Sequence, residues 1–193
     1  MRTPIVTLAT TLTATALIAG CGGGTNHTTD LTGGDKSTAT TTDATDPKNT
    51  AADQTIAVVE RYFQTLSRLD ADYTVPVDAA DDVASGAALN TVKADVTVRR
   101  SKGITITGDI KVVGTKVTDV RLTPPPATVQ VRACVDTSSR DAKYPDGSSA
   151  NAANRVPRQI TQLTVENPAW PDPKGWRVAV DAGNRGGEAC ESA

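Results

Sequence analysis

Hydrophobic residues recur at helical spacing over residues 51–70. The apolar positions of this repeat are Ile56, Val59, Phe63 and Leu66, and Gln54, Arg61, Gln64 and Arg68 occupy the opposite side. A repeat of this kind is typical of an amphipathic helix that buries one face and leaves the other in water. The pattern therefore predicts a first helix over 51–70.

A second helix is predicted after a break at residues 73–76. Residues 78–81 have the aspartate-rich composition of a helix N-terminus, and apolar residues at helical spacing follow them. Residues 96–98 fit either a strand or a continuation of this helix as far as Lys102. In both cases Gly103 ends the segment, because glycine readily adopts the conformation that terminates helices.

The hydrophobic period changes from 3.6 to 2 beyond Gly103. Isoleucine and valine alternate with threonine, aspartate and lysine over 104–112, which predicts a half-buried strand. Residues 113–115 indicate a bulge or a turn, after which the strand continues to the prolines at 124–126.

Three further strands are predicted in the rest of the chain. The first covers 129–136 and precedes a long polar loop, 137–156, which contains a turn signal, Tyr-Pro-Asp-Gly, at 144–147. The last two cover 158–166 and 175–182. Helices first and an antiparallel sheet afterwards predict an α+β fold.

Composition narrows the classes of protein to consider. The chain has 193 residues, which suits one medium-sized domain, and its 20 basic and 22 acidic residues give a formal net charge of −2. We therefore expect no nucleic-acid partner, since no cationic field is available to neutralise phosphates. The single histidine, His27, argues against histidine-based catalysis, and we expect neither a metal nor a cofactor.

The amino terminus has the pattern of an export signal. Residues 1–20 contain one charge, Arg2, and an apolar, threonine-rich run that is too short to remain as a membrane span. The five residues 17–21, Leu-Ile-Ala-Gly-Cys, match the cleavage box of bacterial lipoproteins, in which the cysteine thiol is acylated before the signal is cut. We therefore expect Cys21 to be lipidated, for example with palmitate, and to anchor the chain at the extracytoplasmic face of the cell membrane.

A glycine- and threonine-rich segment follows the predicted anchor. Residues 21–50 contain His27 and one large apolar side chain, Leu31, so they cannot bury enough surface to offset the entropy of ordering. We expect them to form a disordered tether. The folded domain is then expected over 51–193.

The cysteine count supports a disulfide in the folded domain. If Cys21 carries lipid, Cys134 and Cys190 remain, and an exported protein meets an oxidising environment. A redox-active pair is the alternative, but the two cysteines lack the C-x-x-C spacing and a neighbouring histidine. We expect a structural bond between Cys134 and Cys190.

Several short motifs occur in a characteristic order. They are residues 84–89 (ASGAAL), Gly103 and Gly108 around the first strand, 125–129 (PPATV), 134–136 (CVD), 175–178 (GWRV) and the final Cys190. In this order they resemble actinobacterial lipoproteins with a nuclear transport factor 2-like domain, over residues 51–190.

The resemblance implies a cystatin-like cone, in which a strongly curved antiparallel sheet of about 4 to 5 strands wraps around the helices. A cavity can open at the wide end of such a cone. Enzymes of the superfamily, such as ketosteroid isomerases and polyketide cyclases, place carboxylates, histidines or tyrosines there. The lipoprotein branch is mostly without assigned chemistry.

Asp136 is the strongest candidate for a general base. The superfamily can use an aspartate whose pKa is raised by an apolar pocket. Strand alternation argues against this role, because Asp136 shares a face with Gln130 and Arg132, away from the valines of the same strand.

Three aromatic residues, Tyr62, Tyr73 and Trp176, are the side chains expected to line a cavity, if the cone holds one. The alternative is that they belong to the core, as aromatic side chains commonly do in a chain with six of them.

Two clusters of charge flank the predicted second helix. The acids are Asp70, Asp72, Asp78, Asp81 and Asp82, and the bases are Lys93, Arg99, Arg100 and Lys102. We expect the acids to be solvated rather than a calcium site, since no D-x-D-x-D-G run is present. The bases are expected to balance these acids, and the alternative is that they face anionic lipid or a phosphate-bearing wall polymer.

No Ser-His-Asp set, phosphate loop or metal-ligand motif occurs in the sequence. We therefore expect a membrane-anchored, extracytoplasmic lipoprotein that is not an enzyme and acts by binding a small molecule, a lipid or an envelope protein. One alternative is an extracytoplasmic enzyme that uses a carboxylate in the cone. Another is an envelope protein that blocks or modulates uptake, for example in phage exclusion.

Overall fold

The computed structural model describes residues 46–183 and Cys190. The predicted leader, Cys21 and nearly all of the predicted tether lie outside these residues. The elements are α1 (Pro47–Ala71), the 3₁₀ helix η1 (Val77–Asp82), α2 (Gly86–Ser101), β1 (Thr105–Thr107), β2 (Lys111–Arg121), β3 (Ala127–Asp136), β4 (Asp141–Lys143), β5 (Arg158–Asn167), the 3₁₀ helix η2 (Pro173–Gly175) and β6 (Arg177–Asp181).

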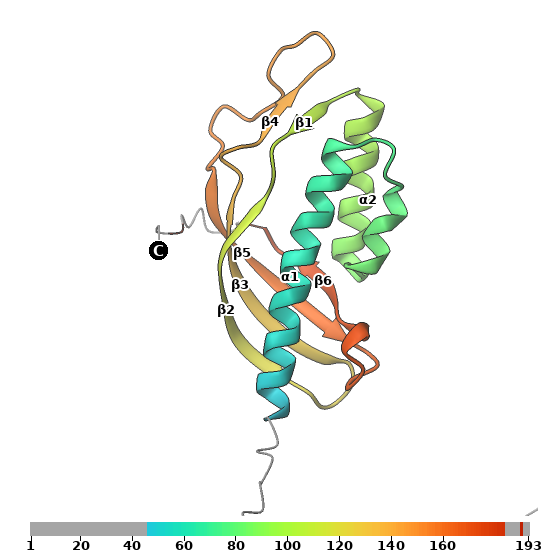
Figure 1. Cartoon of the computed structure of the whole chain (residues 1–193), viewed down its shortest axis with the longest axis vertical. Coiled ribbons are helices and arrows are strands. Elements are labelled where there is room, and N and C mark those ends of the chain that lie inside the picture. Colours follow the sequence, from blue (N-terminus) through green and yellow to red (C-terminus); the bar gives the residue numbers. More distant parts are fainter. Residues whose placement is uncertain (1–45, 184–189, 191–193) are drawn as a thin grey trace, which may run out of the picture. The chain divides into compact units, whose positions relative to one another are not determined.

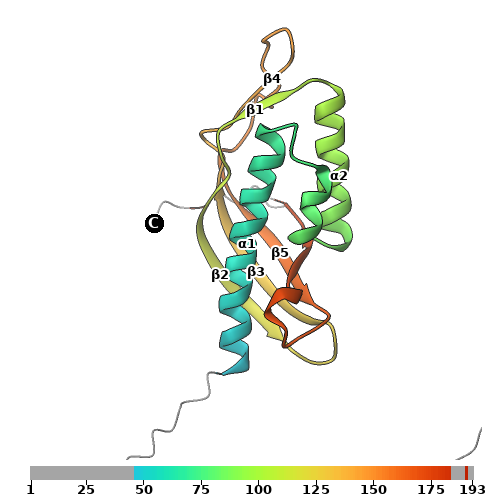
Figure 2. The same cartoon turned by 45° about the vertical axis from the view of Figure 1, so that its right-hand side comes forward.

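The fold is α+β, as the sequence predicts, with helices packed against a curved antiparallel sheet. Four strands pair in the order β2-β3-β5-β6, and β1 pairs with β4 in a second, two-stranded sheet. The large sheet curves around α1, and α2 lies beside α1 on the β6 side (Figures 1 and 2). None of the described helices combines the length and the apolar character that crossing a membrane requires.

The core lies between α1, α2 and the inner face of the large sheet. Burial alternates strictly along β3, where Val129, Val131, Ala133 and Val135 face inward. Leu163 and Val165 of β5 continue these rows across the sheet. The period of 2 that the sequence shows therefore separates the inner from the outer face, as predicted.

The first helix is longer than predicted, because α1 begins at Pro47 rather than at 51. The side chain of Asp46 accepts a hydrogen bond of 2.9 Å from the backbone N–H of Lys48, and proline suits the first helical position. This start falls inside the segment that the composition assigns to the tether.

The predicted start of the second helix, at residues 78–81, is wrong. That segment forms η1, and α2 begins at Gly86 after Ser85. Between the two helices the chain crosses to the sheet edge, where Ser85 N–H donates to the carbonyl of Val178 at 2.8 Å. Residues 96–98 continue the helix, which ends before Gly103 at a φ of +65°.

The strand predicted over 104–112 is divided in two. Gly108 has a φ of +77°, so the chain turns there, and β1 joins a different sheet from β2. The predicted bulge at 113–115 is confirmed by a register shift between Val112 and Gly114. The predicted turn at 144–147 is also confirmed, but β4 lies within the predicted loop.

Candidate functional site

An open groove of about 890 Å³, here called the helix groove, crosses the exposed face of α1. The helix contributes Glu60, Arg61, Gln64 and Arg68, η1 and the residue after it contribute Ala79, Asp82 and Val83, and the other wall is formed by residues 109–113 at the start of β2. The groove therefore borders the exposed side of α1, and its other walls include side chains that pack against the core.

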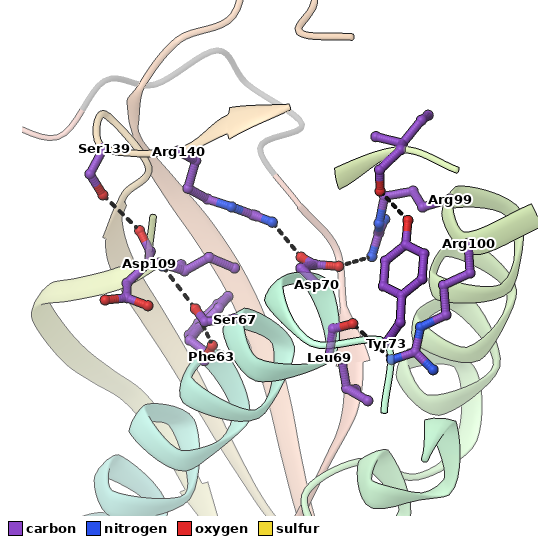
Figure 3. Close-up of polar contacts among 12 residues, drawn as sticks. Phe63, Ser67, Leu69, Asp70, Tyr73, Arg99, Arg100, Asp109, Ser139 and Arg140 are labelled. Carbon is purple, nitrogen blue, oxygen red and sulfur yellow. Dashed lines mark hydrogen bonds and ion pairs between the residues drawn. The ribbon is translucent and has the colours of Figure 1, made fainter. Parts of the chain in front are cut away.

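One side chain fixes the wall formed by β2. Ser67 of α1 accepts a hydrogen bond of 2.9 Å from the backbone N–H of Ile110 and donates one of 3.0 Å to the carbonyl of Phe63 (Figure 3). Ser139 Oγ–H also donates to the carbonyl of Asp109 at 3.2 Å. These bonds hold the beginning of β2 against α1.

The helix groove carries charges of both signs on a partly apolar surface. The acidic lining residues are Glu60, Asp82 and Asp109, and the basic ones are Arg61, Arg68 and Lys111. Ile110, Val112 and Val113 supply apolar surface, and Val113 is 38% exposed. No local sequence pattern indicates this groove, because its residues come from three separated segments.

A buried carboxylate lies near the C-terminal end of α1. The Asp70 side chain is 5% exposed, and its two oxygens pair with Arg99 of α2, at 2.5 Å, and with Arg140 of the connection between β3 and β4 (Figure 3). The prediction that Asp70 is solvated is wrong, because two guanidinium groups compensate its burial. This cluster joins three segments of the chain.

A second hollow, here called the arginine pocket, adjoins this carboxylate and has a volume of about 480 Å³. Its cationic lining residues are Arg99, Arg140 and Arg155. The walls also include Ile104, Ile106, Ala142, Asn151 and Val156. Arg140 and Arg155 belong to a segment whose composition predicts a polar loop. The sequence therefore did not indicate that they line a pocket.

Tyr73 does not line the helix groove. Its hydroxyl donates a hydrogen bond to the carbonyl of Ile104, and the guanidinium of Arg100 lies 5.4 Å from the centre of its ring. Arg100 also donates to the carbonyl of Leu69 at 2.9 Å (Figure 3). Tyr73 therefore connects the segment after α1 with the segment after α2.

Tyr62 and Trp176 belong to the core, the alternative that the sequence left open. Tyr62 is 2% exposed, and its hydroxyl donates to Asp181 at 3.2 Å. Burial, and then the neighbouring Asp181 carboxylate, raise the pKa of Tyr62 far above its usual range. Trp176 donates through Nε1 to Gln54 at 2.9 Å and packs against Trp170. The structure brings none of the three predicted aromatics into the helix groove.

Asp136 lies on the outer face of the sheet, in register with Lys111 and Arg158. A hydrogen bond from Ser138, followed in importance by the charge of Arg158, holds its pKa below the ordinary value. A general base at neutral pH needs a pKa raised toward 7. The position and pKa of Asp136 are those of a paired surface carboxylate.

Four more of the charged residues near α2 have local partners. Lys93 contacts Asp78 at 2.8 Å and Asp81 at 2.9 Å, and these carboxylates raise its pKa. Asp72 accepts hydrogen bonds from the hydroxyl and backbone N–H of Thr74, which lower its pKa. Within the described residues, no group of three His, Cys, Asp or Glu is arranged to hold a metal ion.

Cys134 and Cys190 form a disulfide, as predicted, with Cα atoms 5.8 Å apart. Cys134 lies on the outer face of β3, opposite Ile160 of β5. The bond therefore fixes Cys190 against the outer face of the large sheet. Cys21, the predicted lipidation site, lies outside the described residues.

Comparisons with known proteins add little. No protein-family model matches the chain, and no curated protein matches it. The chain is similar to a solved structure of the intermembrane space region of chloroplast protein ARC6, with 14% identity over 70% of this chain and 94% of that chain, at a TM-score of 0.40. A likeness this weak contributes nothing to the functional argument.

Proposed function

We propose that this protein is a membrane-anchored, extracytoplasmic lipoprotein whose folded domain binds a polypeptide segment of another envelope protein in the helix groove, without catalysing a reaction. The proposal includes the relationship to actinobacterial lipoproteins with a nuclear transport factor 2-like domain that the motif order suggests. It also includes lipidation of Cys21, on the match of residues 17–21 to the lipoprotein cleavage box.

The single observation that supports a binding role is the helix groove. Its volume of about 890 Å³ lies within the range that ligand sites occupy. The wall at the start of β2 is held to α1 by the hydrogen bond between Ser67 and Ile110, so this part of the site is formed before a partner arrives. A preformed surface loses less entropy on binding than a flexible one.

The charges in the groove favour a polypeptide partner. Three acidic and three basic side chains line the groove together with Ile110, Val112 and Val113. A lipid headgroup or a polyanion presents mainly one sign of charge, whereas a peptide presents both signs together with apolar side chains. The alternative of an enzyme with a carboxylate in the cone receives no support from Asp136, which lies on the outer face and has a lowered pKa.

The test uses the full chain in its native membrane. A photo-crosslinking amino acid replaces Gln64 in the helix groove, and a matched control carries it at Gln162, an exposed glutamine on the outer face of β5. The proposal predicts a discrete adduct with one envelope protein from position 64, and a loss of this adduct when Arg61 is changed to Glu. Equal adducts from both positions, or turnover of a substrate in the groove, would contradict it.

The anchor is tested separately. Replacing Cys21 with Ala should abolish incorporation of a labelled fatty acid and release the protein from the membrane fraction. Cys190→Ser is the matched control and should still incorporate the label. Membrane retention and labelling of the Cys21→Ala variant at the level of the unchanged protein would refute the anchor while leaving the groove proposal standing.

A further inference from the structure

We propose that the arginine pocket binds a phosphate-type oxyanion. The pocket is separate from the helix groove, because the two share no lining residue and none of the pocket's lining residues belongs to α1. Its lining comes from α2, residues 104–106, the connection between β3 and β4, β4 and residues 150–159. Three arginines and no acidic side chain occur among the described residues that line it.

The charges around the pocket do not cancel. Asp70 is the carboxylate that faces the cluster, and it pairs with both Arg99 and Arg140. One carboxylate therefore serves two guanidinium groups, and Arg155 adds a third. Among the described residues this leaves two positive charges in excess, which matches the charge of about −1.5 to −2 that a phosphate monoester carries at neutral pH.

Other acidic side chains near the pocket are engaged elsewhere. Asp141 pairs with Lys143 at 3.4 Å and accepts a hydrogen bond of 3.0 Å from the side-chain amide of Asn151. Asp136 pairs with Arg158. Neither aspartate lines the pocket, and each pairs with a cation that also lies outside the lining.

Contacts with neighbouring residues fix two of the three guanidinium groups. Arg155 donates through one terminal nitrogen to the backbone carbonyl of Arg140 at 3.0 Å, which holds the Arg155 guanidinium against the connection between β3 and β4. Arg140 forms an ion pair with Asp70 through a terminal nitrogen, and its buried Nε has no hydrogen-bond partner. Arginine presents its N–H groups as a planar fork that suits phosphate, so these groups can donate to several oxygens of one ligand.

The remaining walls are partly apolar, which favours a ligand with an organic group attached to the phosphate. Ile104, Ile106 and Val156 give the pocket an apolar side, and its volume of about 480 Å³ admits a small organic body beside the anion. Two sources share this chemistry: a soluble phosphate compound and the headgroup of an anionic lipid. The lipid source rests on the membrane anchorage proposed for Cys21.

The experiment titrates the mature full-length protein, in non-ionic detergent at about 150 mM NaCl, with inorganic phosphate by isothermal calorimetry. Binding with a Kd below about 1 mM is expected. The Arg155→Ala variant should bind at least about tenfold more weakly, because it loses one guanidinium while Asp70 keeps both of its ion pairs. Lys143→Ala is the matched control, since Lys143 is basic, exposed and outside the pocket lining, and it should bind like the unchanged protein.

A second pair of probes separates the two sources. Soluble short-chain dihexanoyl phosphatidylglycerol is compared with dihexanoyl phosphatidylcholine, whose headgroup has no net charge. A lipid headgroup is identified if phosphatidylglycerol binds more tightly than inorganic phosphate and if this binding is again weakened in Arg155→Ala. Tighter binding of inorganic phosphate identifies a soluble phosphate compound.

Two results would overturn the proposal. One is the absence of saturable binding of both anions to the folded protein. The other is equal weakening in the Arg155→Ala and Lys143→Ala variants, which would indicate general attraction rather than a site. Either result leaves the crosslinking test of the helix groove unaffected, so the two proposals fail separately.

Discussion

Asp70 and Arg99 lie 29 positions apart in the sequence, on different helices, and their side chains meet at 2.5 Å at the point where α1 and α2 end. Arg140 closes the same carboxylate from the connection between β3 and β4. A buried ion cluster of this kind joins the helical layer to the two-stranded sheet, and the arginine pocket is built on it.

Changing Asp70 to Asn should destabilise the fold strongly. The substitution keeps the shape of the side chain but leaves Arg99 and Arg140 without their buried counter-charge, which typically costs about 3 kcal/mol or more. Urea denaturation followed by circular dichroism measures the change in the free energy of unfolding. The matched control is Asp78→Asn, whose side chain is 82% exposed and whose loss should change stability little. Similar effects of the two variants would show that the cluster contributes no more than a surface pair.

Changing Tyr62 to Phe should lower stability by about 1 kcal/mol at neutral pH, since it removes the hydrogen bond to Asp181. The same variant should alter the alkaline limit of the fold. Burial raises the pKa of Tyr62 in the folded chain, so the stability from keeping this phenol protonated is complete below about pH 10 and falls as the pH rises above that value. Tyr62→Phe should therefore lose stability less steeply above pH 10. Parallel curves for the two proteins would contradict the prediction.

Changing Gly175 to Ala should destabilise the turn before β6. An added methyl group would collide with the side-chain amide of Asn167, which is fully buried and bonds to the carbonyl of Asp172 and the N–H of Ala169. Overpacking of this kind costs about 2 kcal/mol. Gly114→Ala is the control, because no atom lies within 4 Å of the added methyl group, and it should be neutral or slightly stabilising. Thermal unfolding of both variants decides the matter.

Removing the disulfide with Cys190→Ser should lower the free energy of unfolding by about 4 kcal/mol, because the bond closes a loop between residues 56 positions apart. Denaturation of the unchanged protein with and without reductant should give the same difference. Mass spectrometry of the non-reduced protein should find the linked peptides. Two thiols that react with an alkylating reagent in the native protein would rule the bond out.

The sequence predicts the parts of the fold in which the spacing of apolar residues separates a buried face from an exposed one. Burial alternates along β3 as its apolar and polar residues do, and the helical spacing around Val59 and Phe63 marks the buried face of α1. The prediction fails where two residues could each begin the same helix. Asp78 offers a helix start, but Ser85 becomes the N-cap of α2 because Val83 and Ser85 bond to Val178 at the sheet edge, which only the folded chain brings near.

The candidate sites depend still more on distant contacts. Asp70 and Arg140 are 70 positions apart, and no local pattern distinguishes a carboxylate that will be buried by two arginines from its solvated neighbours. Tyr73 was expected near a cavity because it is aromatic and flanks the first helix. Its contacts in the structure, with Ile104 and with Arg100 at the C-terminal end of α2, come from a different segment of the chain. Cysteine pairing was predictable because the count left one combination once Cys21 was assigned to lipid.

The length of α1 sets how far the arginine pocket lies from the point at which the chain enters the folded domain. The chain enters the folded domain at Pro47, and Asp70 lies near the other end of the same 25-residue helix, which is roughly 37 Å long. The start of α1 and the buried carboxylate beside the arginine pocket therefore lie at opposite ends of one rigid helix (Figure 1). A ligand held by the arginine pocket would lie at the end of the domain that is remote from the point where the chain enters it.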